Sequence, residues 1–157
     1  MDLEEILKKL PGELEELKII DLSSHNLNTL DDIKFYSLCN AIMFCANLEV
    51  FIVCNPGIVA LGQHKLNSLF YAVGTLSNLK QLDLSYSELN QLDENSFKLL
   101  CNALSNIRVH KSLTEELILN ISHNNLTKER LIKLNALVNI HESIITTNSN
   151  PRLKLSF

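Results

Sequence analysis

The sequence repeats itself at a regular interval, and this periodicity limits the possible fold more than any other feature. The segment Leu38–Ile42 recurs as Leu100–Leu104, and the midpoint copy is Leu69–Val73. A further copy, Asn135–Ile140, echoes Asn102–Ile107 at a similar spacing. Several matches in one register rarely arise by chance. A period of about 31 residues indicates an array of similar structural units stacked on one another.

A second recurring block lies between these segments and follows the pattern IxLxxxxL. Its four copies begin at Ile20, Phe51, Leu82 and Leu119. Apolar residues that alternate with polar ones predict a short strand with one buried face. The segments between the strands carry apolar residues at three- and four-residue spacing, which predicts helices. We expect these helices over residues 32–46, 64–76, 94–107 and 128–141.

Together the two blocks resemble the leucine-rich repeat family, whose pattern is LxxLxLxxNxL followed by a variable segment. The resemblance covers residues 17–153, and the long period is similar to that of the ribonuclease-inhibitor-like subclass. It implies an α/β fold, a leucine-rich repeat solenoid or horseshoe, with short parallel strands on the concave face and helices on the convex face. One unit cannot bury its apolar face alone, so neighbouring units must stack to make a continuous core.

We expect a single leucine-rich repeat domain over residues 1–157. Residues 1–16 are predicted to form an N-terminal capping helix, residues 17–142 about four repeats, and residues 143–157 a C-terminal cap. Leu3, Ile6, Leu7 and Leu10 give the first helix one apolar face, and Pro11-Gly12 ends it. Between Leu82 and Leu119 one unit is six residues longer than the period. The surplus, within 108–116, is interpreted as a tolerated loop insertion, or else as a decoration of a binding face.

The ninth position of each repeat departs from the family pattern. An asparagine there bonds its amide to backbone groups of adjacent turns, and only Asn124 keeps it. The other copies have His25, Pro56 and Ser87. Pro56 has no side-chain hydrogen-bonding group, so Asn55-Pro56-Gly57 is expected to form a turn of its own. We therefore expect an irregular array.

The charge and the cysteines exclude several classes of protein. The formal net charge is -4, whereas a general nucleic-acid binder needs clustered lysine and arginine, so we expect no nucleic-acid partner. No run of about 18 apolar residues occurs, which argues against membrane insertion. The N-terminal segment 1–17 is acidic and unlike a signal peptide for the general secretory route. Cys39, Cys45, Cys54 and Cys101 lack metal-binding spacing, and we expect free thiols in a reducing compartment.

The side chains that point outward from such a sheet are not needed for the core, so they are free to bind a protein partner. The concave-face residues singled out for this role are Ile19, Asp21, Ser24, Val50, Ile52, Asn55, Gln81, Asp83, Tyr86, Ile118, Asn120 and His123. We expect two columns among them, namely Asp21, Ile52, Asp83 and Asn120, and beside it Ser24, Asn55, Tyr86 and His123. Tyrosine is a frequent anchor of interfaces, and the exposed isoleucines favour contact. The alternative is that β-branched residues suit either face of a small sheet.

Catalysis has little support in the sequence. HExxH, GxSxG, Walker and GxGxxG motifs are all missing, and we expect no enzyme activity, cofactor or metal site. His123 with Ser122 and Asp83 suggests a triad, and Cys54 suggests a thiol nucleophile. Structural roles for Ser122 and Cys54 are the stronger interpretation.

The function that we expect is that of a monomeric protein–protein interaction module. The serine- and asparagine-rich segments LDLSYSEL and ISHNNL are similar to segments of the leucine-rich repeat effectors that intracellular bacterial pathogens, Legionella among them, inject into host cells. That resemblance implies a bacterial cytoplasmic protein that is then translocated into the host cytoplasm. The alternatives are an inhibitor or regulator of an enzyme, and a purely structural or self-assembling repeat.

Overall fold

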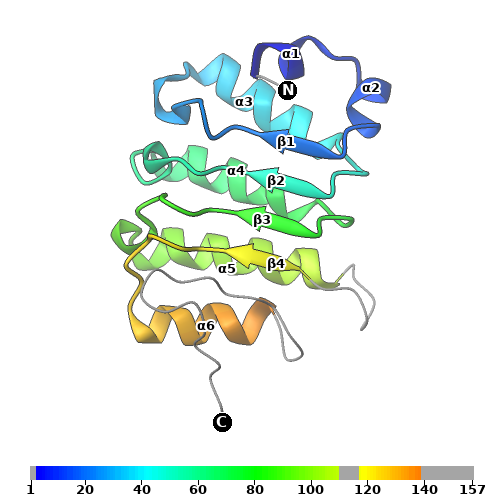
Figure 1. Ribbon diagram of the computed structural model, residues 1–157. Coiled ribbons are helices and arrows are strands. Elements are labelled where there is room, and N and C mark those ends of the chain that lie inside the picture. Colours follow the sequence, from blue (N-terminus) through cyan, green and yellow to red (C-terminus); the bar gives the residue numbers. More distant parts are fainter. Residues whose placement is uncertain (1–2, 110–116, 139–157) are drawn as a thin grey trace.

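The computed structural model describes residues 3–109 and 117–138, and these form an α/β structure (Figure 1). Four parallel strands make one sheet, and their order across it follows their order in the chain. The strands are β1 (Ile19–Asp21), β2 (Val50–Ile52), β3 (Gln81–Asp83) and β4 (Ile118–Asn120). The register pairs the equivalent residues of successive units, so that the middle residues Ile20, Phe51, Leu82 and Leu119 lie side by side. The four predicted strands are therefore confirmed.

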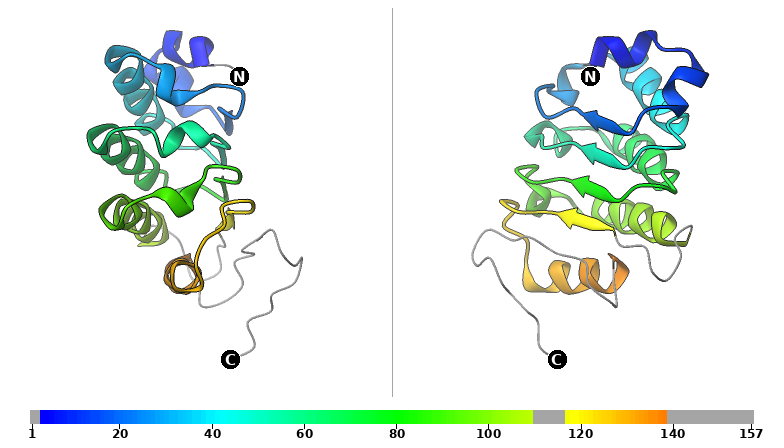
Figure 2. Two further views of the ribbon diagram at one scale, coloured as in Figure 1. Left: turned by 90° about the vertical axis from the view of Figure 1, so that its left-hand side faces the viewer. Right: turned by 45° about the vertical axis from the view of Figure 1, so that its right-hand side comes forward.

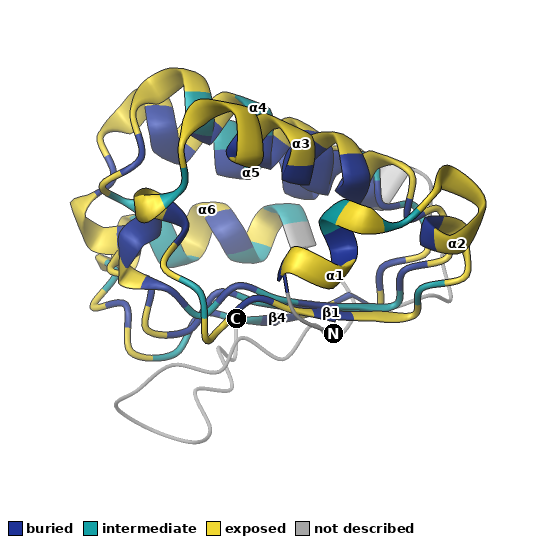
Figure 3. Cartoon of the chain, turned by 90° about the horizontal axis from the view of Figure 1, so that it is seen from above, coloured by how far each residue is buried: buried dark blue, intermediate teal, exposed yellow. Residues whose placement is uncertain are grey.

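The longer helices lie on one side of this sheet (Figures 2 and 3). They are α3 (Asp32–Met43), α4 (Gln63–Gly74), α5 (Glu94–Val109) and α6 (Lys128–Val138). A short 3-10 helix follows each of the first three strands: η1 (Leu27–Thr29), η2 (Pro56–Ile58) and η3 (Leu89–Gln91). Each longer helix begins within one residue of its predicted start. Helices α3 and α4 end two to three residues early, because the chain leaves them through tight turns.

The core lies between the sheet and the helices. The middle residues of all four strands are fully buried. Leu66, Leu69, Phe70 and Val73, which form the apolar stripe of α4, are also buried, and so is Leu76 just after the helix. Burial of one such side chain stabilises the fold by about 1.5–3 kcal/mol. Because each strand adds to the same apolar row, the core is continuous from unit to unit.

The N-terminal segment differs from the single helix predicted over residues 1–16. It forms two short helices, α1 (Leu3–Lys8) and α2 (Pro11–Glu15). Proline has no amide proton and suits the first turn of a helix, so it starts α2 where we expected only an end. Leu3 and Ile6 are buried as predicted, but Leu10 is 70% exposed, because it lies between the two helices.

The six extra residues of the third unit are partly explained. Helix α5 has 16 residues where α3 and α4 have 12, so a longer helix takes up much of the insertion. The rest of the segment 108–116, namely residues 110–116, lies outside the described residues. So do residues 139–141 of the last predicted helix and the C-terminal cap predicted over residues 143–157.

Candidate interaction surface

One face of the sheet points away from the helices and carries most of the predicted binding residues. Side chains alternate between the two faces of a strand, and the register places Ile19, Val50, Gln81 and Ile118 in one column. The second column is Asp21, Ile52, Asp83 and Asn120, as predicted. Two isoleucines are well exposed, Ile19 at 57% and Ile118 at 40%. We call these eight residues, together with Tyr86 and His123, the sheet face.

Three polar members of the second column end the strands on which they lie. The carboxylates of Asp21 and Asp83 accept the backbone N–H two residues further on, each at 2.9 Å. The Asn120 amide oxygen does the same at 3.1 Å. Each is an Asx turn, which gives the backbone a local alternative to the sheet. The repeated letters DLS, DLS and NIS therefore encode turns, a structural role that the sequence-based interpretation of a binding column missed.

Asp83 accepts hydrogen bonds from several neighbours on the sheet face. Besides its turn, it accepts hydrogen bonds from the Cys54 thiol at 3.1 Å and from the Asn120 amide at 2.8 Å. Partial burial alone raises the pKa of Asp83, but the hydrogen bonds from Ser85, Cys54 and Asn120 outweigh it and hold this pKa below its ordinary value of 3.8. The Asp83 carboxylate is thus kept ionised by donors that are part of the fold.

The Cys54 thiol is poorly suited to act as a nucleophile. Burial, followed by the nearby Asp83 carboxylate, raises its pKa to about 11. The attacking form of a cysteine is the thiolate, and a thiol with this pKa stays protonated at neutral pH. All four cysteines are free thiols.

Tyr86 and His123 form an aromatic pair at the ends of β3 and β4. Their ring centroids are 3.8 Å apart with an interplanar angle of 13°. Both residues have a left-handed backbone, with φ of 55° and 62°, and the Tyr86 N–H donates to the Ser122 carbonyl at 3.1 Å. Tyr86 is 56% exposed, so this stacked pair presents a flat aromatic surface beside the two columns.

The other two residues predicted to share a column with Tyr86 and His123, namely Ser24 and Asn55, lie elsewhere. Asn55 is buried, with only 4% of its surface exposed, and its side chain accepts the Gly57 N–H at 2.8 Å and donates to the His25 carbonyl. The expectation that the Asn55 side chain points outward from the sheet is therefore wrong. Ser24 is exposed, and its hydroxyl lies 3.1 Å from Nδ1 of the neighbouring His25.

Asn55 belongs instead to a buried row of hydrogen-bonded polar side chains, which we call the polar ladder. Asn124 accepts the N–H groups of Ser87 and Leu89, both at 3.0 Å, and donates to the Leu84 carbonyl at 2.7 Å. The Ser87 hydroxyl donates to the Val53 carbonyl at 3.0 Å. It also accepts the Asn55 N–H at 3.1 Å. Asn55 then reaches the first unit through His25. The ladder is continuous, although its side chains differ.

A second feature that sequence reasoning missed is a row of charges at the start of the strands. Glu49 pairs with Lys18 at 3.2 Å and with Lys80 at 2.7 Å. These ion pairs, Lys80 first, lower the pKa of Glu49. The three residues follow one another at the repeat interval, so the period itself was the available signal.

No helix among residues 3–109 and 117–138 combines the length and the apolar character needed to cross a membrane. In the same part of the chain, no three His, Cys, Asp or Glu side chains gather as metal ligands. No protein-family model matches this sequence, and neither a curated protein nor a solved structure matches the chain.

Proposed function

We propose that the chain is a leucine-rich repeat solenoid that binds a protein partner through its sheet face. Three observations support this proposal. The strands and the longer helices both recur at about the same interval as the sequence repeat. Successive strands lie next to one another, with the helices on one side. The opposite side of the sheet offers a row of outward side chains that the core does not use.

The observation that carries the proposal is the stacked pair of Tyr86 and His123. A left-handed backbone is unfavourable for residues other than glycine, at about 1–3 kcal/mol for each strained position, although asparagine, aspartate and histidine adopt it more readily than the rest. Glu88 and Asn125 have a similar φ two residues after Tyr86 and His123, so the same turn recurs in both units. Within this turn the exposed Tyr86 is the costly member of the aromatic pair, and strain of this kind concentrates at functional sites.

The surroundings of the pair indicate what a partner must offer. Ile118 and Ile52 add apolar surface, and the Asp21 carboxylate is exposed at the far edge of the sheet. Aromatic residues in the centre of an interface contribute most of its binding energy. We infer a protein surface with an apolar or aromatic anchor that packs on the Tyr86 ring.

The test compares two matched variants that each replace a large exposed side chain with asparagine. Tyr86→Asn removes the ring but suits the left-handed backbone, so the fold is retained. Ile132→Asn removes an apolar side chain of similar exposure on α6, among the helices on the other side of the sheet. Partners are captured from host-cell lysate with the wild type, identified by mass spectrometry, purified and titrated.

We expect Tyr86→Asn to weaken the affinity at least about tenfold, which is about 1.4 kcal/mol, and Ile132→Asn to leave it within about twofold. Equal affinity of the wild type and Tyr86→Asn for every purified partner would show that the sheet face is not the binding site.

We further propose that the protein acts as an effector inside a host cell, and here the support is the similarity of sequence wording alone. A translocation reporter fused to the chain would test this proposal in a bacterium with a dedicated secretion system. We expect reporter signal in the host cytoplasm that depends on that system. A signal equal to that of the secretion-deficient strain would contradict the proposal.

A further inference from the structure

Beyond their first turns, α3 and α4 carry no charge. Between Phe35 and Leu48, and again between Leu66 and Leu79, there is no Asp, Glu, Lys, Arg or His, although a fifth of the whole chain is charged. Protein surfaces normally mix charges of both signs over about a quarter to a third of their residues. An uncharged surface across two neighbouring helices is therefore unusual.

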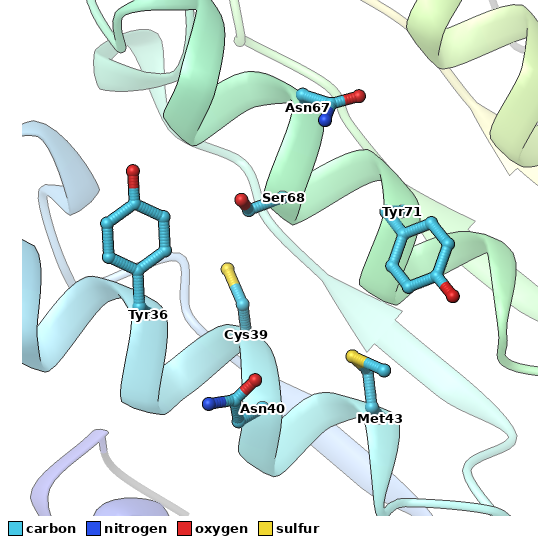
Figure 4. A pocket seen from close by; sticks show the side chains of 7 residues that line it. All are labelled: Tyr36, Cys39, Asn40, Met43, Asn67, Ser68 and Tyr71. Carbon is cyan, nitrogen blue, oxygen red and sulfur yellow. The ribbon is translucent and has the colours of Figure 1, made fainter.

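Large apolar side chains are exposed on this same surface. Tyr36 is 37% exposed, Met43 41%, Phe44 48% and Tyr71 61%. A groove of about 310 Å³ runs between the two helices. Figure 4 shows the residues that line it, with Tyr36, Asn40 and Met43 on α3 and Asn67, Ser68 and Tyr71 on α4. We call these six residues and Phe44 the neutral helix face.

Two ion pairs border the neutral helix face at one end. Where α3 and α4 begin, Lys34 lies 3.0 Å from Glu4, and Lys65 lies 2.9 Å from Asp32. The composition thus follows the arrangement of an interface, in which an uncharged centre rich in Tyr, Phe and Met is surrounded by a polar rim.

We propose that the neutral helix face binds a second copy of this chain and forms a two-fold symmetric dimer. Each chain has a net charge of -4, so two copies repel one another on average. On the neutral helix face two copies can approach without bringing like charges together. A charged partner, in contrast, gains no electrostatic complementarity there.

The groove is also self-complementary. In a two-fold interface the same surface must match itself. The amides of Asn40 and Asn67 and the hydroxyl of Ser68 each both donate and accept hydrogen bonds, so two copies of the groove can satisfy one another. The protruding Tyr36 and Tyr71 rings on one copy suit the groove of the other.

The available area agrees with a dimer. From their exposed fractions, the side chains of Tyr36, Met43, Phe44 and Tyr71 offer roughly half of the about 800 Å² that each partner buries in a specific interface. The amides and hydroxyls between them supply further area. The sheet face lies on the opposite side (Figure 3), so a dimer would leave both copies of it accessible. This inference does not depend on the proposed function, and it revises the monomer expected from the sequence.

The test is sedimentation of the purified chain alone, from about 1 to 200 µM. We expect the mass to rise with concentration from 17.8 kDa towards twice that value. Tyr71→Lys and Met43→Lys place two like charges in the interface, so each should raise the dissociation constant by about 100-fold or more. Ile19→Lys, on the sheet face, is the matched control and should leave it within about twofold.

Salt provides a second readout. Because the interface contains no ion pairs, the dissociation constant should change by less than about threefold between about 50 and 500 mM salt. Circular dichroism establishes that each variant is folded. A monomer at every concentration would overturn the proposal, and so would a dimer that survives both lysine variants or responds equally to Ile19→Lys.

Discussion

Asn124 binds the backbone of Ser87, which lies one unit before it in the chain. Its amide oxygen accepts the Ser87 N–H at 3.0 Å, and Ser87 uses its own hydroxyl on the unit before that. Both side chains are buried, at 1% and 0% exposure. Buried backbone groups must find partners within the protein. Each side chain of the ladder therefore completes the hydrogen bonding of the preceding turn.

Removal of the Asn124 amide should destabilise the chain strongly. Asn124→Ala leaves the Ser87 and Leu89 N–H groups and the Leu84 carbonyl without this partner. Each orphaned buried group costs about 1–3 kcal/mol, and we expect a loss of about 3 kcal/mol in the free energy of unfolding, measured by urea denaturation. Asn102→Ala, at an exposed position of α5, is the control and should change it by less than about 0.5 kcal/mol. A loss for Asn124→Ala no larger than that of the control would contradict the ladder.

Gly57 is required by close packing. A Cβ at this position would overlap the side-chain oxygen of Asn26 and lie 2.8 Å from that of Asn55. We expect Gly57→Ala to lower the free energy of unfolding by about 2 kcal/mol. The double variant with Asn26→Ala should recover part of this loss, since the closest clash is removed. Gly12→Ala, where a Cβ meets nothing within 4 Å, should be neutral or stabilising, because alanine suits a helix better. Equal melting curves for the two glycine variants would refute the packing argument.

Arg130 on α6 and Lys65 on α4 make equivalent contacts with the unit before them. Arg130 donates to the carbonyls of Leu89 at 3.0 Å and Leu92 at 2.6 Å, and its guanidinium lies 4.6 Å from the Phe97 ring centroid. Lys65 likewise donates to the Leu30 carbonyl at 3.0 Å, and its ammonium lies over the Phe35 ring. In both places the cation fixes the turn that opens the neighbouring helix.

Arg130→Lys should be destabilising although the charge is retained. Lysine cannot reproduce the planar fork that reaches two carbonyls, and we expect a loss of about 1–2 kcal/mol in the free energy of unfolding. Lys133→Ala is the control on the same helix, because its pair with Glu94, at 3.6 Å, is exposed and contributes less than about 1 kcal/mol. If Arg130→Lys were the milder of the two changes, bidentate bonding would not be the reason for the arginine.

Stability should depend on the charge of Asp83. Its pKa in the folded chain is lower than the ordinary 3.8, so its contribution is fully present above the unfolded pKa and is lost as the pH falls through the folded one. We expect Asp83→Asn to be less stable than the wild type at pH 7, and the difference to narrow below roughly pH 4. Urea denaturation from pH 7 to pH 3 measures it. A gap that stays constant or widens on acidification would contradict this prediction, and Glu15→Gln controls for the loss of one exposed carboxylate.

The cysteines should react slowly in the folded chain. Burial raises the pKa of Cys39 to about 12 and that of Cys45 to about 11, and the pKa of Cys54 is raised to about 11 as well. Compared with a thiol of pKa 9.0, a pKa of about 11 lowers the thiolate fraction at pH 7.5 about 100-fold. We expect Cys39, Cys45 and Cys54 to be alkylated well over tenfold more slowly than in the urea-unfolded chain, as followed by mass spectrometry. Rates within about tenfold of each other would be inconsistent with these values.

Sequence periodicity predicted the strands and the helix starts because both depend on where apolar residues fall. Ile20, Phe51, Leu82 and Leu119 occupy equivalent positions in the sequence and in the sheet. The same logic placed the column of Asp21, Ile52, Asp83 and Asn120 correctly, but not the neighbouring column, in which Asn55 is buried. It said nothing about which polar side chains remain available, since an outward position also allows a bond to the local backbone.

The mistakes follow from that limit. Asp83 and Asn55 look alike as polar residues near strand ends, yet one lies on the sheet face and the other is buried in the ladder. Pro56 occupies the ninth position and cannot bond through its side chain, so Asn55 beside it takes the place in the polar ladder. No motif or repeated residue marks the neutral helix face in the sequence, because this surface is defined by the charges that α3 and α4 lack.

The polar ladder also has a direction. Asn124 completes the turn that contains Ser87, Ser87 completes the one that contains Asn55, and Asn55 completes the turn at His25. Each unit therefore depends on the one synthesised after it. During translation, the last turn to leave the ribosome has amides that lack hydrogen-bond partners until the next unit has also emerged. Folding should then advance one unit behind synthesis, and a chain released before Asn124 should be cut by protease first within 84–89.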